Sequence, residues 1–175
     1  MKKITFIIAL VLTSGLICRA QTAPTKSANE KVEAASAETE REKFDPARDP
    51  KIDLQTAIAN AQVDGKRIIL DVGGEWCGWC RYMDKFFSQN PRLAKIRAEN
   101  FVWLKVNFSD ENENKEFLAS YPAIKGYPHL FVLEKDGTLL HSQDTAALEG
   151  EKSYNLQIFT EFLKKWSPAK ESSGK

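Results

Sequence analysis

Apolar residues change their spacing several times along the chain, and each spacing predicts an element. Between Leu54 and Ala61 they recur at helical spacing, and Gly65 then provides a helix stop. Residues 67–72 contain a continuous Ile-Ile-Leu run, and residues 101–108 are apolar nearly throughout. Such runs are typical of strands in a parallel sheet that is covered on both faces. The pattern therefore predicts a helix and two buried strands.

A helical pattern also fills the interval between these two strands. It begins after a pair of cysteines and places Phe86 and Phe87 on one apolar face. The Asn90-Pro91 pair breaks this helix and opens a second one that continues to about residue 99.

The second half of the chain predicts another helix, a hairpin and a last helix. Residues 110–121 begin with a capping-box-like Asp-x-x-Glu sequence and predict a helix. Strands over residues 129–133 and 138–142 flank an Asp-Gly turn. The last helix is expected to be capped by Ser153 and to present one apolar stripe as far as Trp166.

This order of elements predicts an α/β fold. The first strand–helix–strand unit should form a right-handed parallel crossover, and the hairpin should add an antiparallel pair to the same sheet. We therefore expect a central mixed sheet of about four strands with helices on both faces, formed by one domain over residues 49–166.

The two ends of the chain differ in composition from this domain. Residues 1–20 combine a basic start, an apolar run and a small residue before a polar segment, which predicts a cleavable secretory signal peptide. A lipid anchor at Cys18 is the less favoured alternative, because the residues before it resemble a lipobox poorly. Residues 21–48 are polar and predict a flexible linker, and residues 167–175 predict a disordered tail.

Charge and cysteine content narrow the possible functions. The 25 basic residues fall to 22 when residues 1–20 are removed, against 24 acidic ones, so the net charge becomes about −2. No basic patch indicates nucleic-acid binding, and no later segment is apolar enough to cross a membrane. Two of the three cysteines remain, and two neighbouring cysteines cannot build a disulfide framework.

These two cysteines, Cys77 and Cys80, form a Cys-Gly-Trp-Cys motif between a buried strand and a helix. A helix N-terminus carries partial positive charge, which should lower the pKa of a cysteine there from about 8.5 to roughly 3.5–7.5. The spacing keeps both sulfurs within one helical turn, so a disulfide can close. The alternative is half of a zinc site, but a structural site needs four ligands, and only His129 and His141 remain as nitrogen donors.

The motif and its surroundings resemble the thioredoxin superfamily, and the resemblance covers residues 49–166. Asp71, six residues before Cys77, matches the buried carboxylate of that family, and Lys105 matches the lysine that pairs with it. Gly126-Tyr127-Pro128 stands where the family has a cis-proline. The run Gly-Glu-Trp-Cys-Gly-Trp-Cys is most similar to exported thioredoxin-like proteins related to the C-terminal domain of the membrane thiol reductase (DsbD-like) group, and also resembles small thioredoxin-like proteins of the endoplasmic reticulum.

The resemblance implies a role for each of these residues. Cys77 would attack a substrate disulfide to form a mixed disulfide, and the more buried Cys80 would resolve it. Desolvation in an apolar strand should raise the pKa of Asp71 and let it act as a base toward Cys80. The alternative for Asp71 is a structural carboxylate that is hydrogen-bonded or paired with Lys105. His129 is expected to face solvent, with a position beside Cys77 as its alternative.

A further set of residues beside the cysteines is expected to contact substrates: Trp76, Gly78, Trp79, Tyr127 and Pro128. Trp76 would cover the site, with core packing as the alternative, and Trp79 is expected to be exposed. The backbone of Tyr127 would be free to pair with a substrate strand.

Two of these positions depart from the family pattern. Trp79 stands where thioredoxin has proline and the isomerases have histidine, and Tyr127 is bulkier than the usual residue before the cis-proline. Both positions tune the redox potential in the family, so they leave the direction of electron flow open. We favour a reductase of protein disulfides; the alternatives are an oxidase or isomerase on the same fold, and a non-catalytic module that binds metal or a partner.

The favoured interpretation implies a location and partners. The protein would be periplasmic or secreted, would act on oxidised protein substrates as a monomer, and would be reduced again by a membrane thiol donor. No metal or organic cofactor is implied, because the disulfide itself carries the electrons.

Overall fold

The computed structural model describes residues 41–169. The expectations for the signal peptide, for residues 21–40 and for the end of the tail lie outside this range. In chain order the elements are α1 (Pro50–Asp64), β1 (Arg67–Gly73), α2 (Gly78–Gln89), α3 (Pro91–Asn100), β2 (Phe101–Asn107), α4 (Lys115–Leu118), β3 (His129–Leu133), β4 (Leu139–Asp144), a 3-10 turn (Thr145–Leu148) and α5 (Leu156–Trp166).

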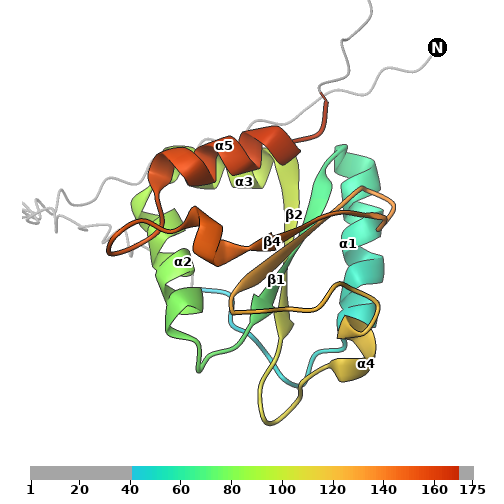
Figure 1. Ribbon diagram of the computed structural model, residues 1–175. Coiled ribbons are helices and arrows are strands. Elements are labelled where there is room, and N and C mark those ends of the chain that lie inside the picture. Colours follow the sequence, from blue (N-terminus) through green and yellow to red (C-terminus); the bar gives the residue numbers. More distant parts are fainter. Residues whose placement is uncertain (1–40, 170–175) are drawn as a thin grey trace, which may run out of the picture. The chain divides into compact units, whose positions relative to one another are not determined.

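The four strands form one mixed sheet in the order β2-β1-β3-β4 (Figure 1). β1 and β2 are parallel, with Asp71 opposite Lys105, and β3 pairs antiparallel with both β1 and β4. The parallel crossover, the hairpin and the mixed sheet are thus confirmed.

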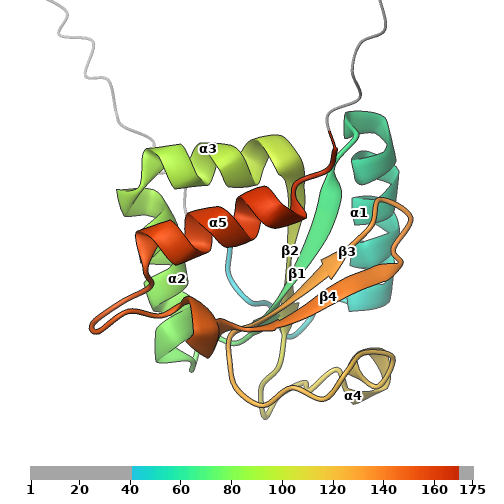
Figure 2. The ribbon, with the colours of Figure 1, turned by 45° about the horizontal axis from the view of Figure 1, so that its top comes forward.

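Helices cover both faces of this sheet. Figures 1 and 2 show α1 on one face and α3 and α5 side by side on the other. Because side chains alternate along a strand, Leu70 and Val72 pack toward α1, whereas Ile69 packs toward α2, α3 and α5. Asp71 and Lys105 follow the same alternation as Ile69, so both side chains lie on the α2 side of the sheet.

Local signals account for the first helix. Asp49 accepts a hydrogen bond from the Lys51 amide, and Pro50 occupies the first helical position, where its missing N–H costs nothing. Gly65 adopts a left-handed conformation with φ 66° and ends the helix as predicted.

Two helices differ from their predictions. The helix expected over residues 110–121 is a single turn, because Asn114 before it is left-handed with φ 47° and its side chain bonds back to the Asn107 carbonyl at 2.7 Å. Asn155 rather than Ser153 caps α5, since its side chain accepts from the amides of Gln157 and Ile158.

The ordered domain begins before residue 49. Residues 41–48, which the sequence assigns to the linker, contact the domain, and Phe44 is only 3% exposed. At the other end, Arg67 donates hydrogen bonds to the carbonyls of Trp166 and Ser167, so the first residue of the predicted tail also contacts the domain. Within the described range, no helix is both long and apolar enough to span a membrane.

Candidate active site

The two cysteines lie where β1 ends and α2 begins. Cys77 is the N-cap of α2, and the Cys80 amide donates a hydrogen bond to Cys77 Sγ at 3.1 Å. The sulfurs form a disulfide whose Cα atoms are 5.3 Å apart. Cys77 is 4% exposed and Cys80 2%, so both sulfurs are withdrawn from the surface. A thiolate formed at Cys77 would be stabilised by the free N–H groups at this helix end.

Charged side chains are buried on the α2 side of the sheet, the side on which the cysteines lie. Asp71 Oδ2 lies 3.6 Å from Lys105 Nζ and accepts a hydrogen bond of 3.1 Å from Trp103 Nε1. Asp71 Oδ1 has no hydrogen-bond partner in the described part of the chain. Burial raises the pKa of Asp71, and the nearby ammonium of Lys105 offsets this only in part. This carboxyl group can therefore hold a proton at a pH where an exposed aspartate could not.

The closest partner of Lys105 is a residue that the sequence analysis did not single out. Lys105 Nζ lies 2.9 and 3.0 Å from the two carboxylate oxygens of Asp84, closer than it lies to Asp71. Asp84 follows Cys80 by four residues on α2, so both share one face of that helix. That spacing is the signal that could have found it.

Asp84 has a second partner in the segment before α1. Arg41 Nη1 donates to Asp84 Oδ2 at 2.9 Å and to Glu75 Oε1 at 3.1 Å, and Arg41 Nη2 also pairs with Glu75. Arg81 donates a hydrogen bond to the backbone carbonyl of the same Glu75. Nothing in the composition of residues 21–48 pointed to these contacts.

Aromatic rings cover the outer side of the site. Trp76 is 57% exposed, and its indole N–H donates to the Phe108 carbonyl at 2.7 Å. The Tyr127 ring meets Trp76 edge-on at 5.6 Å and stacks on Phe108 at 4.7 Å. The peptide bond between Tyr127 and Pro128 is cis, and Tyr127 packs against the cysteines. Trp76 is therefore exposed beside Tyr127 and Phe108, and the core-packing alternative is wrong.

Trp79 and His129 lie elsewhere than expected. Trp79 is half-buried, because its ring packs against Tyr82 and Tyr154 at 5.6 and 5.4 Å. His129 is buried rather than facing solvent: Nε2 lies 2.8 Å from Ser142 Oγ, and burial lowers its pKa. Gly78, which lies between the two cysteines, is exposed.

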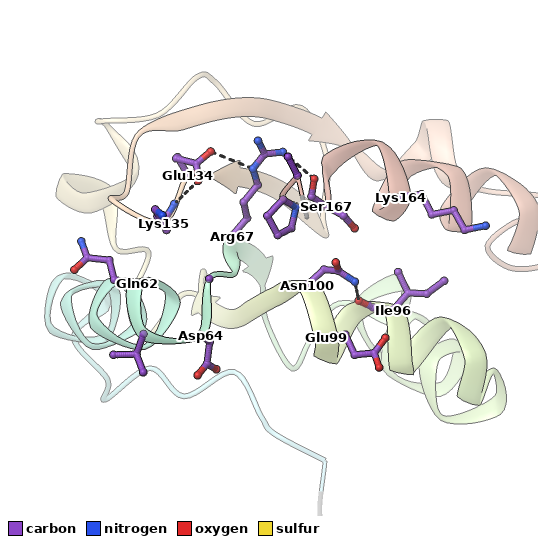
Figure 3. A pocket seen from close by; sticks show the side chains of 14 residues that line it. Gln62, Asp64, Arg67, Ile96, Glu99, Asn100, Glu134, Lys135, Lys164 and Ser167 are labelled. Carbon is purple, nitrogen blue, oxygen red and sulfur yellow. Dashed lines mark hydrogen bonds and ion pairs between the residues drawn. The ribbon is translucent and has the colours of Figure 1, made fainter. Parts of the chain in front are cut away.

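The other cavities and side-chain clusters of the described residues are weaker candidates for a functional site. Among residues 41–169, no group of three or more His, Cys, Asp and Glu side chains could hold a metal ion. A large cavity of about 1080 Å³ lies at the start of β1, roughly 20 Å along the strand from the cysteines (Figure 3). Its central charge, Arg67, is bound to Glu134 and to the end of α5. A smaller cleft of about 660 Å³ adjoins Trp76 and Phe108.

The fold is that of thioredoxin: a β2-β1-β3-β4 mixed sheet carries a Cys-x-x-Cys disulfide at a helix N-terminus, beside a buried carboxylate and a cis-proline. Residues 49–135 match the family model described as Thioredoxin-like. The chain thus carries a thioredoxin-superfamily domain, and this domain is similar to the C-terminal domain of DsbD proteins.

Relatives in sequence support this assignment. The chain is 27% identical to the thiol:disulfide interchange protein DsbD of Pseudomonas fluorescens over 139 residues, 79% of this chain and 22% of that protein. It is 30% identical to an uncharacterised protein of Caenorhabditis elegans over 127 residues, 67% of this chain and 17% of that protein. The chain therefore spans only about a fifth of the length of the curated relatives it matches.

Solved structures support the fold. A disulphide isomerase from Xylella fastidiosa superposes with a TM-score of 0.61 at 24% identity, over 70% of this chain and 94% of that one. The oxidised C-terminal domain of DsbD from Neisseria meningitidis gives a TM-score of 0.53 at 19% identity, over 71% and 99%.

Proposed function

We propose that this protein is an exported thiol–disulfide oxidoreductase that reduces disulfides in other proteins. The observation that carries the proposal is the Cys77–Cys80 disulfide at the N-terminus of α2, because this position favours the thiolate that exchange requires. The similarity to DsbD, whose name describes thiol:disulfide interchange, supports the same class of reaction.

The reaction begins with the reduced protein. The Cys77 thiolate attacks one sulfur of a substrate disulfide, forms a mixed disulfide and releases the other substrate sulfur as a thiolate, which takes up a proton. Cys80 then loses its proton and attacks Cys77 Sγ. The second substrate sulfur leaves as a thiolate and takes up a proton, and the Cys77–Cys80 disulfide remains, so two electrons have passed to the substrate.

Asp71 is proposed to receive the proton of Cys80. Its raised pKa matches it to this task, and its Oδ1 is free to accept a hydrogen bond. Lys105 is the counter-charge that limits the rise in pKa. Trp76, Gly78, Trp79, Tyr127 and Pro128 are proposed to form the docking face, with Trp76 as its most exposed aromatic residue.

Turnover requires an electron source. An oxidising compartment outside the cytoplasm, to which the predicted signal peptide would direct the chain, would leave the disulfide closed. We therefore propose that a membrane thiol donor reduces it again, in keeping with the DsbD relatives.

The test is reduction of insulin by dithiothreitol with and without the protein. We expect the protein to accelerate the reaction, and Cys77→Ala to abolish the acceleration. No acceleration by the unaltered protein would favour a binding module. The reduction potential separates the remaining alternatives: a value below about −230 mV supports a reductase, and one above about −180 mV supports an oxidase or isomerase.

A further inference from the structure

The segment that precedes α1 lies against the disulfide. We call Arg41–Phe44 the N-terminal strap. In Figure 1 the chain runs from beside α2 to the start of α1, and the strap is the first part of this stretch. The match to the thioredoxin-like family model begins at residue 49, so the strap lies outside the part of the fold that the match covers.

Hydrogen bonds from Arg41 and Phe44 fix the strap in place. Arg41 bridges Glu75, in the loop before Cys77, to Asp84 on α2. The Phe44 amide donates to Glu75 Oε1 at 2.9 Å. Glu75 and Asp84 flank the cysteines on either side in sequence, so the strap ties together the two segments that carry the disulfide.

Phe44 is the residue that this anchoring positions. Its ring is buried and forms a cluster with Cys77 and Cys80. Lys105 Nζ lies 4.1 Å from the centre of the same ring. A methyl group added to Gly73 would meet both Cys80 Sγ and the Phe44 ring, which shows how closely these groups approach. Phe44 therefore separates the disulfide and Lys105 from solvent on this side.

We propose that Phe44, held by Arg41, is a positioning residue that sets the redox equilibrium of the Cys77–Cys80 pair by covering it; this inference rests on the proposed exchange function. The disulfide is uncharged, whereas the reduced pair carries a thiolate that water would stabilise. An apolar ring that excludes water favours the uncharged form. The strap thus makes the reduced protein a stronger electron donor.

The first experiment measures the equilibrium between the full chain and glutathione. Two glutathione thiols reduce the disulfide, giving one glutathione disulfide and two cysteine thiols. We expect Phe44→Ala to raise the equilibrium constant for reduction about tenfold, equivalent to about 30 mV. Phe44→Leu should stay within about twofold of the unaltered protein because it restores an apolar cover.

Phe117→Ala is the matched control. It removes another buried phenylalanine, from the α1 side of the sheet, and should leave the equilibrium constant within about twofold. The proposal is overturned if Phe44→Ala shifts the constant no more than Phe117→Ala does, or if Phe44→Leu shifts it as far as the alanine variant.

A second experiment tests the cover directly and does not require Phe44→Ala to fold. The reduced protein is treated with iodoacetamide, and alkylation of the Cys77–Cys80 pair is followed by peptide mass spectrometry, which separates the pair from Cys18. Arg41→Gln should speed alkylation at least threefold by releasing the strap. Arg48→Gln, which breaks a 2.7 Å ion pair with Asp53 beyond the strap, should not. Equal rates in the two variants would overturn the proposal.

Neither experiment depends on a protein substrate. If the insulin assay fails while glutathione and iodoacetamide give the expected shifts, the proposed reductase function is wrong and the cover remains. If insulin is reduced but the strap variants change nothing, only the role of the strap is wrong.

Discussion

The buried carboxyl group of Asp71 suits the proposed proton transfer, but in its ionised form it lowers the stability of the folded protein. Its pKa is raised by burial, so the folded protein binds this proton more tightly than the unfolded chain does. The resulting stabilisation is fully present below the pKa of an ordinary aspartate and is lost as the pH rises through the raised value. Above this raised pKa the ionised side chain therefore lowers the free energy of unfolding. A role as proton acceptor for Cys80 would explain why such a residue is present.

Asp71→Asn should show this cost. Asparagine keeps the shape of the side chain and an oxygen for Trp103, but it cannot ionise. We expect the oxidised variant to match the unaltered protein near pH 4 and to have the larger free energy of unfolding near pH 8. Urea unfolding at both pH values measures it, with the exposed Asp110→Asn as the control. A difference that does not grow with pH would contradict the assignment.

Gly73 is constrained by space rather than by backbone conformation. A Cβ atom there would lie 2.5 Å from Cys80 Sγ and 3.2 Å from Phe44 Cζ. Gly73→Ala should therefore destabilise the protein by about 1–3 kcal/mol, the usual effect of overpacking. Gly78→Ala, between the cysteines, would meet nothing within 4 Å and should change stability by less than about 0.5 kcal/mol. Equal losses in chemical denaturation would show that the crowding at Gly73 is relieved elsewhere.

At the scale of elements, the sequence predicted those whose signals are local. The apolar run of β1, the Asp-Gly turn and the Gly65 stop each act within a few residues, and each is confirmed. The predicted length of α4 was wrong. Hydrogen bonds from the Asn107 and Asn114 side chains keep the preceding residues in a loop that is bound to the end of β2. Spacing around Asp110 could not reveal contacts that depend on the end of β2.

The candidate site divides in the same way. Cys77 and Cys80 could be found from their spacing, whereas Arg41 and Phe44 could not. A single phenylalanine in a polar segment has no periodic apolar neighbours, and the sequence pattern therefore does not predict its burial. Phe44 is buried only because folding brings α2 and β2 together beside it. His129 was misplaced for a related reason, since its partner Ser142 is brought opposite by the pairing of β3 with β4.

The N-cap of α5 gives an element-scale test. Asn155 satisfies the amides of Gln157 and Ile158, so Asn155→Ala should cost about 1 kcal/mol of stability. Ser153, which the sequence favoured as the cap, makes no such contact in α5, and Ser153→Ala should change stability by less than about 0.5 kcal/mol. Thermal unfolding of the two oxidised variants decides between them. A larger loss from Ser153→Ala would contradict the capping by Asn155.

At the scale of the whole molecule, segments that are far apart in the sequence pack together around the disulfide. The strap, the end of β1 and the loop before β3 all contact it, through Phe44, Gly73 and Tyr127 respectively. Folding and redox state are therefore linked: whichever redox form these contacts fit better is also the more stable folded form. A strong oxidant of the DsbA type has a stabilised reduced form.

The closely packed, apolar surroundings of this disulfide predict the opposite order. We expect the oxidised protein to have the larger free energy of unfolding, by at least about 1.4 kcal/mol, which corresponds to 30 mV for a two-electron couple. Guanidinium unfolding of the oxidised form, and of the form kept reduced with dithiothreitol, measures the difference. The Cys77→Ala variant should unfold at the same denaturant concentration with and without reductant. If the reduced form is the more stable one, the fold favours release of oxidising equivalents, and the protein would act as an oxidase rather than as a reductase.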